Sequence, residues 1–216
     1  MIVRVFVIFL LLLPGSITAQ ETDVVTYIID NDKSWIRVLV YRAGLMSRLG
    51  HNHVISNNDV EGFIKCTDQV TDTVANLKFS VESFVVDDLS LRDIEGGVFS
   101  AKVTAKDING TRKNMLSRKL LNAENFAKIL IQTTAVSGEP DDLKVAANVN
   151  VGGQESSIGF SAKADVSENQ LTVSGTAEIS HKDLGLKPFS TALGMLKVHQ
   201  DMTIRFFLIA RPLPEQ

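Results

Sequence analysis

Two histidines separated by one residue are the strongest candidates for chemistry in this chain. They lie in the segment Gly50-His51-Asn52-His53. If this segment is extended, His51 and His53 project from the same face of a strand, with Cβ atoms about 7 Å apart. Neutral imidazoles at that spacing can bind one metal ion, orient the headgroup of a ligand, or cap loop carbonyls at the rim of a β-barrel. A metal site would need a further ligand, such as His181, His199 or an aspartate from another strand.

The other reactive residues do not indicate an enzyme. The chain has no Gly-x-Ser-x-Gly nucleophile elbow, and Gly152-Gly153 is not followed by the Lys-Ser/Thr pair of a phosphate-binding loop. Asp87 and Asp88 end a predicted strand, where acids commonly solvate a turn. Cys66 is the only cysteine, so no intramolecular disulfide can form, and a small buried hydrophobe is its expected role. We therefore predict a protein that is not an enzyme and has no cofactor.

The N-terminus has the features of a secretory signal peptide. Arg4 precedes an apolar run from Val5 to Leu13, and a small-residue segment ends at Ala19. The run is about half of the ~20 residues that a membrane-spanning helix needs. We predict cleavage after Ala19, which gives a signal peptide over residues 1–19, one domain over residues 20–216, no transmembrane segment and a periplasmic or secreted location. The formal net charge of −3 gives no electrostatic case for nucleic-acid binding.

Alternation of apolar and polar residues predicts an all-β domain. Leu171–His181 and Met202–Ala210 alternate on either side of a turn-rich connection, as two antiparallel strands that close a barrel or sandwich would. Ala75–Val86 is the clearest strand of the first half. One predicted face of that strand carries Leu77, Phe79, Val81, Ser83 and Val85, and the other carries Lys78, Ser80, Glu82 and Phe84. With the remaining segments the chain has about eight or nine strands, and a sheet of that size tends to close on itself.

The alternation stops between Asp87 and Ala127, where the apolar spacing is closer to that of a helix. We predict that the longest helix lies in this interval, and that Thr111–Leu121 forms a short amphipathic helix. A barrel of about eight strands is either filled by its own side chains or holds one small ligand. The glycine, alanine and serine residues within the predicted strands fit both possibilities.

Three parts of the sequence follow the pattern of one known family. They are Tyr27-Ile-Ile-Asp30 with Ser34-Trp-Ile-Arg-Val38, Arg118-Lys-Leu-Leu-Asn122 with Phe126-Ala-Lys-Ile129, and the closing set Asp183-Leu-Gly185, Pro188-Phe189, Gly194, Leu196-Lys-Val198 and Asp201. In these residues the chain resembles the YceI-like family of exported, lipid-binding barrels. It departs from that pattern at Ala127, where the family usually has proline, and over Val149–Ile158, which follows a family hairpin only loosely.

The resemblance implies an antiparallel, lipocalin-like β-barrel of about eight strands with a short helical insertion. It also implies an apolar tunnel and a binding protein that sequesters or carries a long isoprenoid-type lipid, such as a quinone or a polyprenyl phosphate. We expect His51 and His53 at the rim, near the lipid headgroup. The alternative is a metal-binding or redox-accessory protein that uses this His pair, and a homodimer is compatible with either reading. The predicted interior lining is Ile36, Val38, Val40, Leu77, Phe79, Val81, Ile129, Ile131, Val173, Ile179, Ile204 and Phe206.

Overall fold

The computed structural model describes residues 23–167 and 169–214, and within them the chain is mostly β-strand. The predicted signal peptide, residues 1–19, lies outside the described residues. The strands are β1 (Val25–Ile29), β2 (Trp35–Ala43), β3 (His53–Asn57), β4 (Val60–Cys66), β5 (Val74–Ser80), β6 (Val85–Val86), β7 (Lys128–Glu139), β8 (Asp142–Val151), β9 (Gln154–Ser167), β10 (Gln170–Ser180), β11 (Ser190–Thr191) and β12 (Leu196–Pro212). The helices of the described residues are α1 (Leu89–Glu95) and α2 (Ala105–Leu116).

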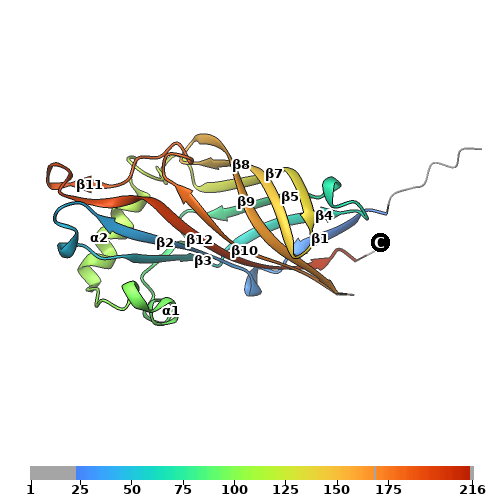
Figure 1. Ribbon diagram of the computed structural model, residues 1–216, viewed down its shortest axis with the longest axis horizontal. Coiled ribbons are helices and arrows are strands. Elements are labelled where there is room, and N and C mark those ends of the chain that lie inside the picture. Colours follow the sequence, from blue (N-terminus) through green and yellow to red (C-terminus); the bar gives the residue numbers. More distant parts are fainter. Residues whose placement is uncertain (1–22, 168, 215–216) are drawn as a thin grey trace, which may run out of the picture.

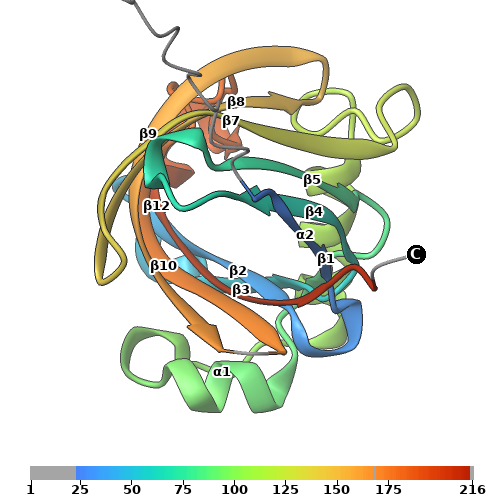
Figure 2. The ribbon, with the colours of Figure 1, turned by 90° about the vertical axis from the view of Figure 1, so that its right-hand side faces the viewer.

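Eight of the strands form a closed antiparallel barrel, as predicted. The order around it is β1-β4-β5-β7-β8-β9-β10-β12, and β1 pairs with β12 to complete the ring. Figure 2 looks along the barrel axis and shows the strands arranged in a ring. Closure gives each of these eight strands a partner on both sides, although β9 and β10 pair only from Gln170 opposite Ser167 to Ser174 opposite Lys163. Alternate side chains along each strand must point inward.

The long strand β12 extends the sheet beyond the closed ring. Its residues from Lys197 to Phe207 pair with β2, from Ala43 opposite Lys197 to Trp35 opposite Phe207, and β3 and β6 continue the sheet from β2. Helix α2 lies at this end of the molecule, away from β1 (Figure 1). Its buried Met115 and the partly buried Ile108 and Leu116 pack against the barrel core. The two ends of the barrel therefore differ in what surrounds them.

The longest helix lies between Asp87 and Ala127 as predicted, but the predicted bounds Thr111–Leu121 are wrong. Helix α2 begins six residues earlier because Thr104 caps it. The Thr104 hydroxyl accepts a hydrogen bond from the Asp107 backbone N–H at 3.2 Å, and the Asp107 carboxylate accepts one from the Thr104 N–H at 3.0 Å. This reciprocal capping box satisfies two N–H groups that the first helical turn would leave unpaired.

The predicted strand Ala75–Val86 is broken in two. Strand β5 ends at Ser80, opposite Lys128, which is the first residue of β7, so the ladder has no further partner. The chain turns and pairs again as β6 with β3. The turn reverses the phase of the side chains: Phe84 and Val86 are buried, whereas Val85, which was predicted to share the apolar face of Leu77, is half exposed.

Helix α1 lies outside the barrel beside β3 (Figure 2). Together with the following turn it covers the outer face of β2 and β3. The covered residues Leu39, Val54 and Phe99 form a small second core of their own. Within the residues that the structure describes, no helix combines the length and apolar character that a membrane crossing requires.

Candidate functional site

An apolar cavity of about 260 Å³ occupies the barrel at the end away from α2. Its walls come from the inward faces of the barrel strands, and among the described residues no lining side chain carries a charge. The polar groups in the walls are the hydroxyls of Thr67, Thr73 and Thr133 and the thiol of Cys66. Such a space can bind hydrocarbon, because it offers apolar contact without a polar group that a hydrocarbon would leave unpaired.

Cys66 is the one lining group in this cavity that could react. Burial raises the pKa of its thiol, with a hydrogen bond to Thr73 acting in the opposite direction. A thiol with a raised pKa is a poor nucleophile at neutral pH. Cys66 therefore contributes apolar surface to the cavity.

Glycine at position 175 allows an aromatic ring to reach the cavity wall. A Cβ atom built there would lie 2.5 Å from Cζ of Phe206 and 2.7 Å from the Ser161 carbonyl oxygen. Phe206 packs edge-to-face on Phe160, with ring centroids 5.7 Å apart. Any side chain at 175 would displace this pair, so the missing Cβ helps to shape the wall.

The predicted interior residues fall into three groups. The apolar cavity is lined by Ile36, Leu77, Ile131, Val173, Ile179, Ile204 and Phe206. Val40 lines a second cavity near α2. The remaining four, Val38, Phe79, Val81 and Ile129, belong to the packed core and line neither cavity. Their role as ligand contacts remains a prediction.

A packed layer separates the two cavities. On β12, Ile204 lines the apolar cavity, Val198 lines the second one, and the buried Met202 between them lines neither. The same order holds on β2, where Val38 lies between Ile36 and Val40. A chain that occupies both cavities must displace this layer, and an unbranched methionine adapts to that more readily than most side chains.

The second cavity, of about 330 Å³, lies between β2, β3, α2 and the start of β12, and its lining combines apolar side chains with charged and histidine side chains. We call it the polar cavity because these charged and histidine groups are absent from the lining of the first one among the described residues. Its cationic lining residues are Arg42, Lys106 and Lys197, and its acidic residue is Asp107. The Asp107 carboxylate is already held by the capping box of α2, which lowers its pKa. The cavity therefore presents an excess of positive charge, which suits an anionic or strongly polar group.

His51, His53 and His181 line the same polar cavity. The rings of His51 and His53 are 6.4 Å apart between centroids and stand edge to face. His181 is buried, and burial lowers its pKa, although hydrogen bonding to the Gln200 carbonyl and the nearby Asp201 oppose the shift. His199 is exposed and faces Asp201 at 3.7 Å instead.

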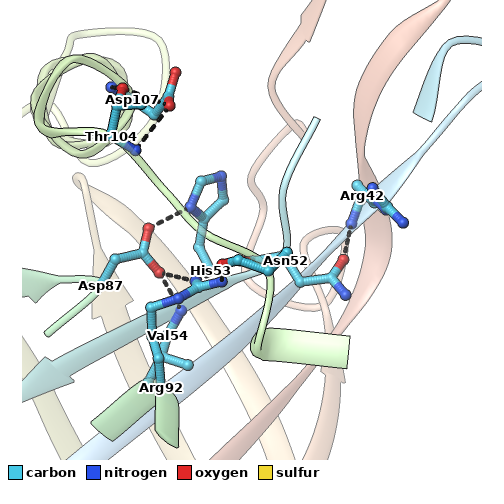
Figure 3. A network of polar contacts seen from close by, with 9 residues as sticks. Arg42, Asn52, His53, Val54, Asp87, Arg92, Thr104 and Asp107 are labelled. Carbon is cyan, nitrogen blue, oxygen red and sulfur yellow. Dashed lines mark hydrogen bonds and ion pairs between the residues drawn. The ribbon is translucent and has the colours of Figure 1, made fainter. Parts of the chain in front are cut away.

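His53 is held in place by a buried carboxylate (Figure 3). Its Nδ1 lies 2.6 Å from Oδ2 of Asp87, and the other ring nitrogen is turned away from that carboxylate. Because an ionised carboxylate only accepts hydrogen bonds, Nδ1 must carry the proton that it donates. Nε2 of the neutral ring is then left as an acceptor, and on protonation it becomes a donor.

The expectation that Asp87 solvates a turn is wrong. Its side chain is fully buried, and its Oδ1 accepts hydrogen bonds from the Val54 N–H at 3.0 Å and from the Arg92 guanidinium. Burial would raise the pKa of Asp87, but the hydrogen bond and charge of His53 and the hydrogen bonds from Val54 and Arg92 outweigh it and hold the pKa below its usual value. Asp88, in contrast, does lie at the surface and caps α1.

Arg92 connects this carboxylate to the surrounding backbone. Its guanidinium also donates to the carbonyls of Asn52 and Ala101, each at 2.8 Å. The side chain of Asn52, between the two histidines, accepts from the Arg42 N–H and donates to the Val98 carbonyl. The His-Asn-His segment is thereby fixed on both sides (Figure 3).

The comparison with protein families identifies this barrel. The model of the YceI-like domain matches residues 27–210, which is most of the chain. The chain belongs to the YceI-like family. A sequence search of curated proteins gave no match.

Solved structures of YceI-like and related barrels share the fold at low sequence identity. BcnA of Burkholderia cenocepacia superposes with a TM-score of 0.60 at 11% identity, covering 84% of this chain and 98% of BcnA. A polyisoprenoid binding domain from Saccharophagus degradans gives 0.56 at 13% identity, over 87% of this chain and 98% of that domain. The Campylobacter jejuni YceI protein gives 0.52 at 8% identity, over 74% and 85%. Likeness at these identities shows the fold.

The two departures from the YceI-like sequence pattern leave the barrel regular. The carbonyl of Ala127, in place of the usual proline, accepts a hydrogen bond from the Val81 N–H at 2.9 Å. Strands β8 and β9 pair without interruption from Leu143 opposite Ala162 to Val151 opposite Gln154. The Gly152-Gly153 turn closes this hairpin with both residues at positive φ, where glycine is favoured.

The His pair of this YceI-like barrel is evident from the sequence, but the buried Asp87 and Arg92 that fix His53 are not. Asp87 lies 34 residues after His53, and Arg92 follows on another element. The one local signal is that Asp87 lies just before a short helix and Arg92 lies five residues later within it. This arrangement also occurs in ordinary surface helices. In the described part of the chain, no group of three or more His, Cys, Asp or Glu side chains is arranged to hold a metal ion.

Proposed function

We propose that this protein binds a long, apolar isoprenoid-type lipid, with the chain in the barrel and the headgroup at the polar cavity. The observation that carries the proposal is the apolar cavity inside a closed YceI-like barrel. At ~24 cal/mol per Å³, an empty space of about 260 Å³ forgoes on the order of 6 kcal/mol of packing energy. A bound hydrocarbon restores such contacts, at about 0.8 kcal/mol per buried methylene.

The proportions of the two cavities favour a chain with one polar end. Each is near the lower limit of the ~300–1,000 Å³ range typical of ligand pockets, at about 260 and 330 Å³. A chain of several isoprene units therefore extends from one cavity through the Met202 layer into the other. Its headgroup then meets His51, His53 and the cationic side chains, which suits a quinone or a polyprenyl phosphate.

The structural neighbours support the ligand class. One of them is described as a polyisoprenoid binding domain, and it shares this fold over nearly its whole length. Among the described residues that line the two cavities, no nucleophile is activated by a neighbouring base, which supports binding rather than catalysis. The charge and spacing of the residues before Ala19 support export.

Thermal unfolding of delipidated protein tests lipid binding. At a lipid concentration 100 times Kd, binding adds about 2.7 kcal/mol of stability. For a domain of this size that raises Tm by about 5–10 °C. A long-chain quinone or polyprenyl phosphate should give this shift, and an analogue with one isoprene unit should give little. Equal melting temperatures with and without the long-chain lipids would contradict the proposal.

Export is tested on the native protein. Fractionation of the source cells should place the mature chain outside the cytoplasm, with an N-terminal sequence that starts at Gln20. A chain that begins at Met1 in the cytoplasmic fraction would contradict export without affecting lipid binding.

Metal binding at the His pair is a second candidate function, favoured by the contact between His53 and Asp87. Histidines that bind metals commonly donate their other ring N–H to a carboxylate, which fixes the ring. Elemental analysis of freshly purified protein should then show one transition metal per chain, lost in the variant His51→Ala. Metal-free protein that binds no zinc would eliminate this function.

A further inference from the structure

Two loops meet at the α2 end of the barrel and form its outermost tip. Gly44–Leu49 is the first part of the connection between β2 and β3, and Leu193–Met195 precedes β12. The Met46 N–H donates to the Met195 carbonyl at 2.8 Å. At Gly44, with φ of +94°, a Cβ atom would lie 2.4 Å from the same carbonyl oxygen, so the close approach requires glycine. We call Leu45, Leu49, Leu193 and Met195 the apolar tip.

The leucines of the apolar tip are unusually exposed. Leu193 is 102% and Leu45 93% exposed, relative to the extended reference state, and they are the most exposed large hydrophobic residues described. Leu193 also has φ of +56°, in the left-handed region that leucine rarely adopts. Scattered exposed leucines need no explanation, but a cluster of them at one projecting end indicates a surface that contacts another apolar phase.

The charge around the apolar tip is opposite to that of the whole protein. Segments 42–50 and 181–198, which build this end, contain Arg42, Arg48, Lys182, Lys187 and Lys197, all exposed, and one acid, Asp183. Their formal net charge is +4, whereas the complete chain carries −3. The two segments that contain the apolar tip are therefore net positive in a chain that is net negative.

We propose that the apolar tip docks onto an anionic lipid bilayer. A bilayer offers negative headgroups to the lysines and arginines and an apolar interior to the leucines, which is the pattern of peripheral membrane binding. A second copy of the chain is a poorer partner, because a two-fold contact would bring two segments of +4 charge together. Leu49 and Lys197 belong both to this end and to the lining of the polar cavity. The docked barrel thus opens its polar cavity at the bilayer surface.

Docking onto a bilayer does not depend on the lipid binding proposed above. A role of docking in moving that lipid between the barrel and the bilayer does rest on the proposed function. The two are separable because vesicle binding and extracted lipid are measured on the same preparation by different methods. A protein that binds vesicles and contains no lipid would retain the docking proposal and refute the cargo. A protein that contains lipid and does not bind vesicles would retain the lipid-binding proposal and refute docking.

Vesicle co-sedimentation tests the proposal with the mature wild-type protein. Binding to vesicles of equal parts phosphatidylglycerol and phosphatidylcholine should exceed binding to pure phosphatidylcholine at least tenfold, and should fall as salt screens the charges. The variant Leu45→Glu/Leu193→Glu should bind the anionic vesicles at least tenfold more weakly. The matched control is Leu89→Glu/Ile94→Glu on α1, where both side chains are 67% exposed, and it should bind as the wild type does.

A charge variant and an oligomer measurement complete the test. Arg48→Glu/Lys187→Glu leaves the leucines in place and should also weaken binding to anionic vesicles. Absence of wild-type binding, or equal losses in the tip and α1 variants, would overturn the proposal. So would a dimer in sedimentation velocity that the tip variant dissociates while vesicle binding is absent, since the apolar tip would then be a contact between two copies.

Discussion

The two ends of the barrel hold cavities of similar size, and they differ in whether charged and histidine side chains stand among the apolar ones. At the end near β1 and the β7–β8 turn, the described wall residues carry no charge, and small residues such as Ala177 and Gly175 shape the wall. The end near α2 carries three histidines and three cationic side chains, and His53 is fixed by buried Asp87. The properties of the apolar cavity depend on its volume, whereas those of the polar cavity depend on the orientation of individual side chains. Substitutions should therefore have different consequences at the two ends.

The largest effect on stability is expected at the polar end. Arg92→Ala removes a buried partner of Asp87 and leaves that carboxylate with His53 and one N–H. Breaking a buried ion pair in this way typically costs about 3–5 kcal/mol. Urea unfolding at pH 7 measures it, with the exposed Arg118→Ala as control, because the pair of Arg118 and Glu124 lies at the surface. If Arg92→Ala lowers the free energy of unfolding by less than about 1 kcal/mol, Asp87 and Arg92 do not form the buried ion pair described above.

The same enlargement should be tolerated in the apolar cavity and not in the packed wall. Ala147→Leu inserts three carbons at a fully buried position that lines neither cavity, and overpacking of that kind costs about 1–3 kcal/mol. Ala177→Leu places the same atoms into the apolar cavity and should cost less or nothing. Urea unfolding of the two lipid-free variants compares them directly. Equal destabilisation would show that the cavity is filled by side chains in solution.

Acid should weaken the polar end in two separate ranges of pH. The pKa of His181 is lowered from 6.5 in the fold, so the unfolded chain takes up its proton first and the free energy of unfolding falls as pH drops below about 6.5. The pKa of Asp87 is also lowered, so its stabilising contribution is complete above the unfolded value of about 3.9 and is lost as pH falls through the folded pKa. The free energy of unfolding should be measured from pH 8 to 3. The decrease below about pH 6.5 should be absent in His181→Gln, and the decrease at lower pH should be smaller in Asp87→Asn. An unchanged profile in both variants would refute the assignment.

His51 gives the smallest expected effect on stability and the clearest test of headgroup contact. It lines the polar cavity, whereas His53 is also part of the Asp87 network and its removal would disturb the fold. His51→Ala should leave the urea midpoint unchanged and weaken binding of a polyprenyl phosphate severalfold. Binding of the matching uncharged polyprenol should change less. If both lipids lose affinity equally, His51 contacts the chain and not the headgroup.

The apolar end could be predicted from sequence better than the polar end. Period-2 alternation in Leu171–His181 placed Val173 and Ile179 on the inward phase, because strand geometry ties each side chain to one face. The same rule failed at Val85, since the break after Ser80 is set by where β7 begins, far along the chain. Asp87 beside Asp88 looks like a solvated turn because its partners, His53 and Arg92, come from other elements. The local sequence pattern therefore predicts which face of a strand a side chain occupies. It does not predict contacts between residues far apart in the sequence, such as those of Asp87.

Lipid in the apolar cavity is measured by native mass spectrometry of the wild type and of Ala177→Leu, both prepared identically from the source organism. We expect one isoprenoid-type lipid per wild-type chain, released and identified on activation, and little or none in the variant, whose added side chain occupies the apolar cavity. Lipid at equal occupancy in both proteins would place the ligand elsewhere. Wild-type protein at the mass of the bare polypeptide, with no lipid bound after incubation with quinone or polyprenyl phosphate, would refute lipid binding by this barrel.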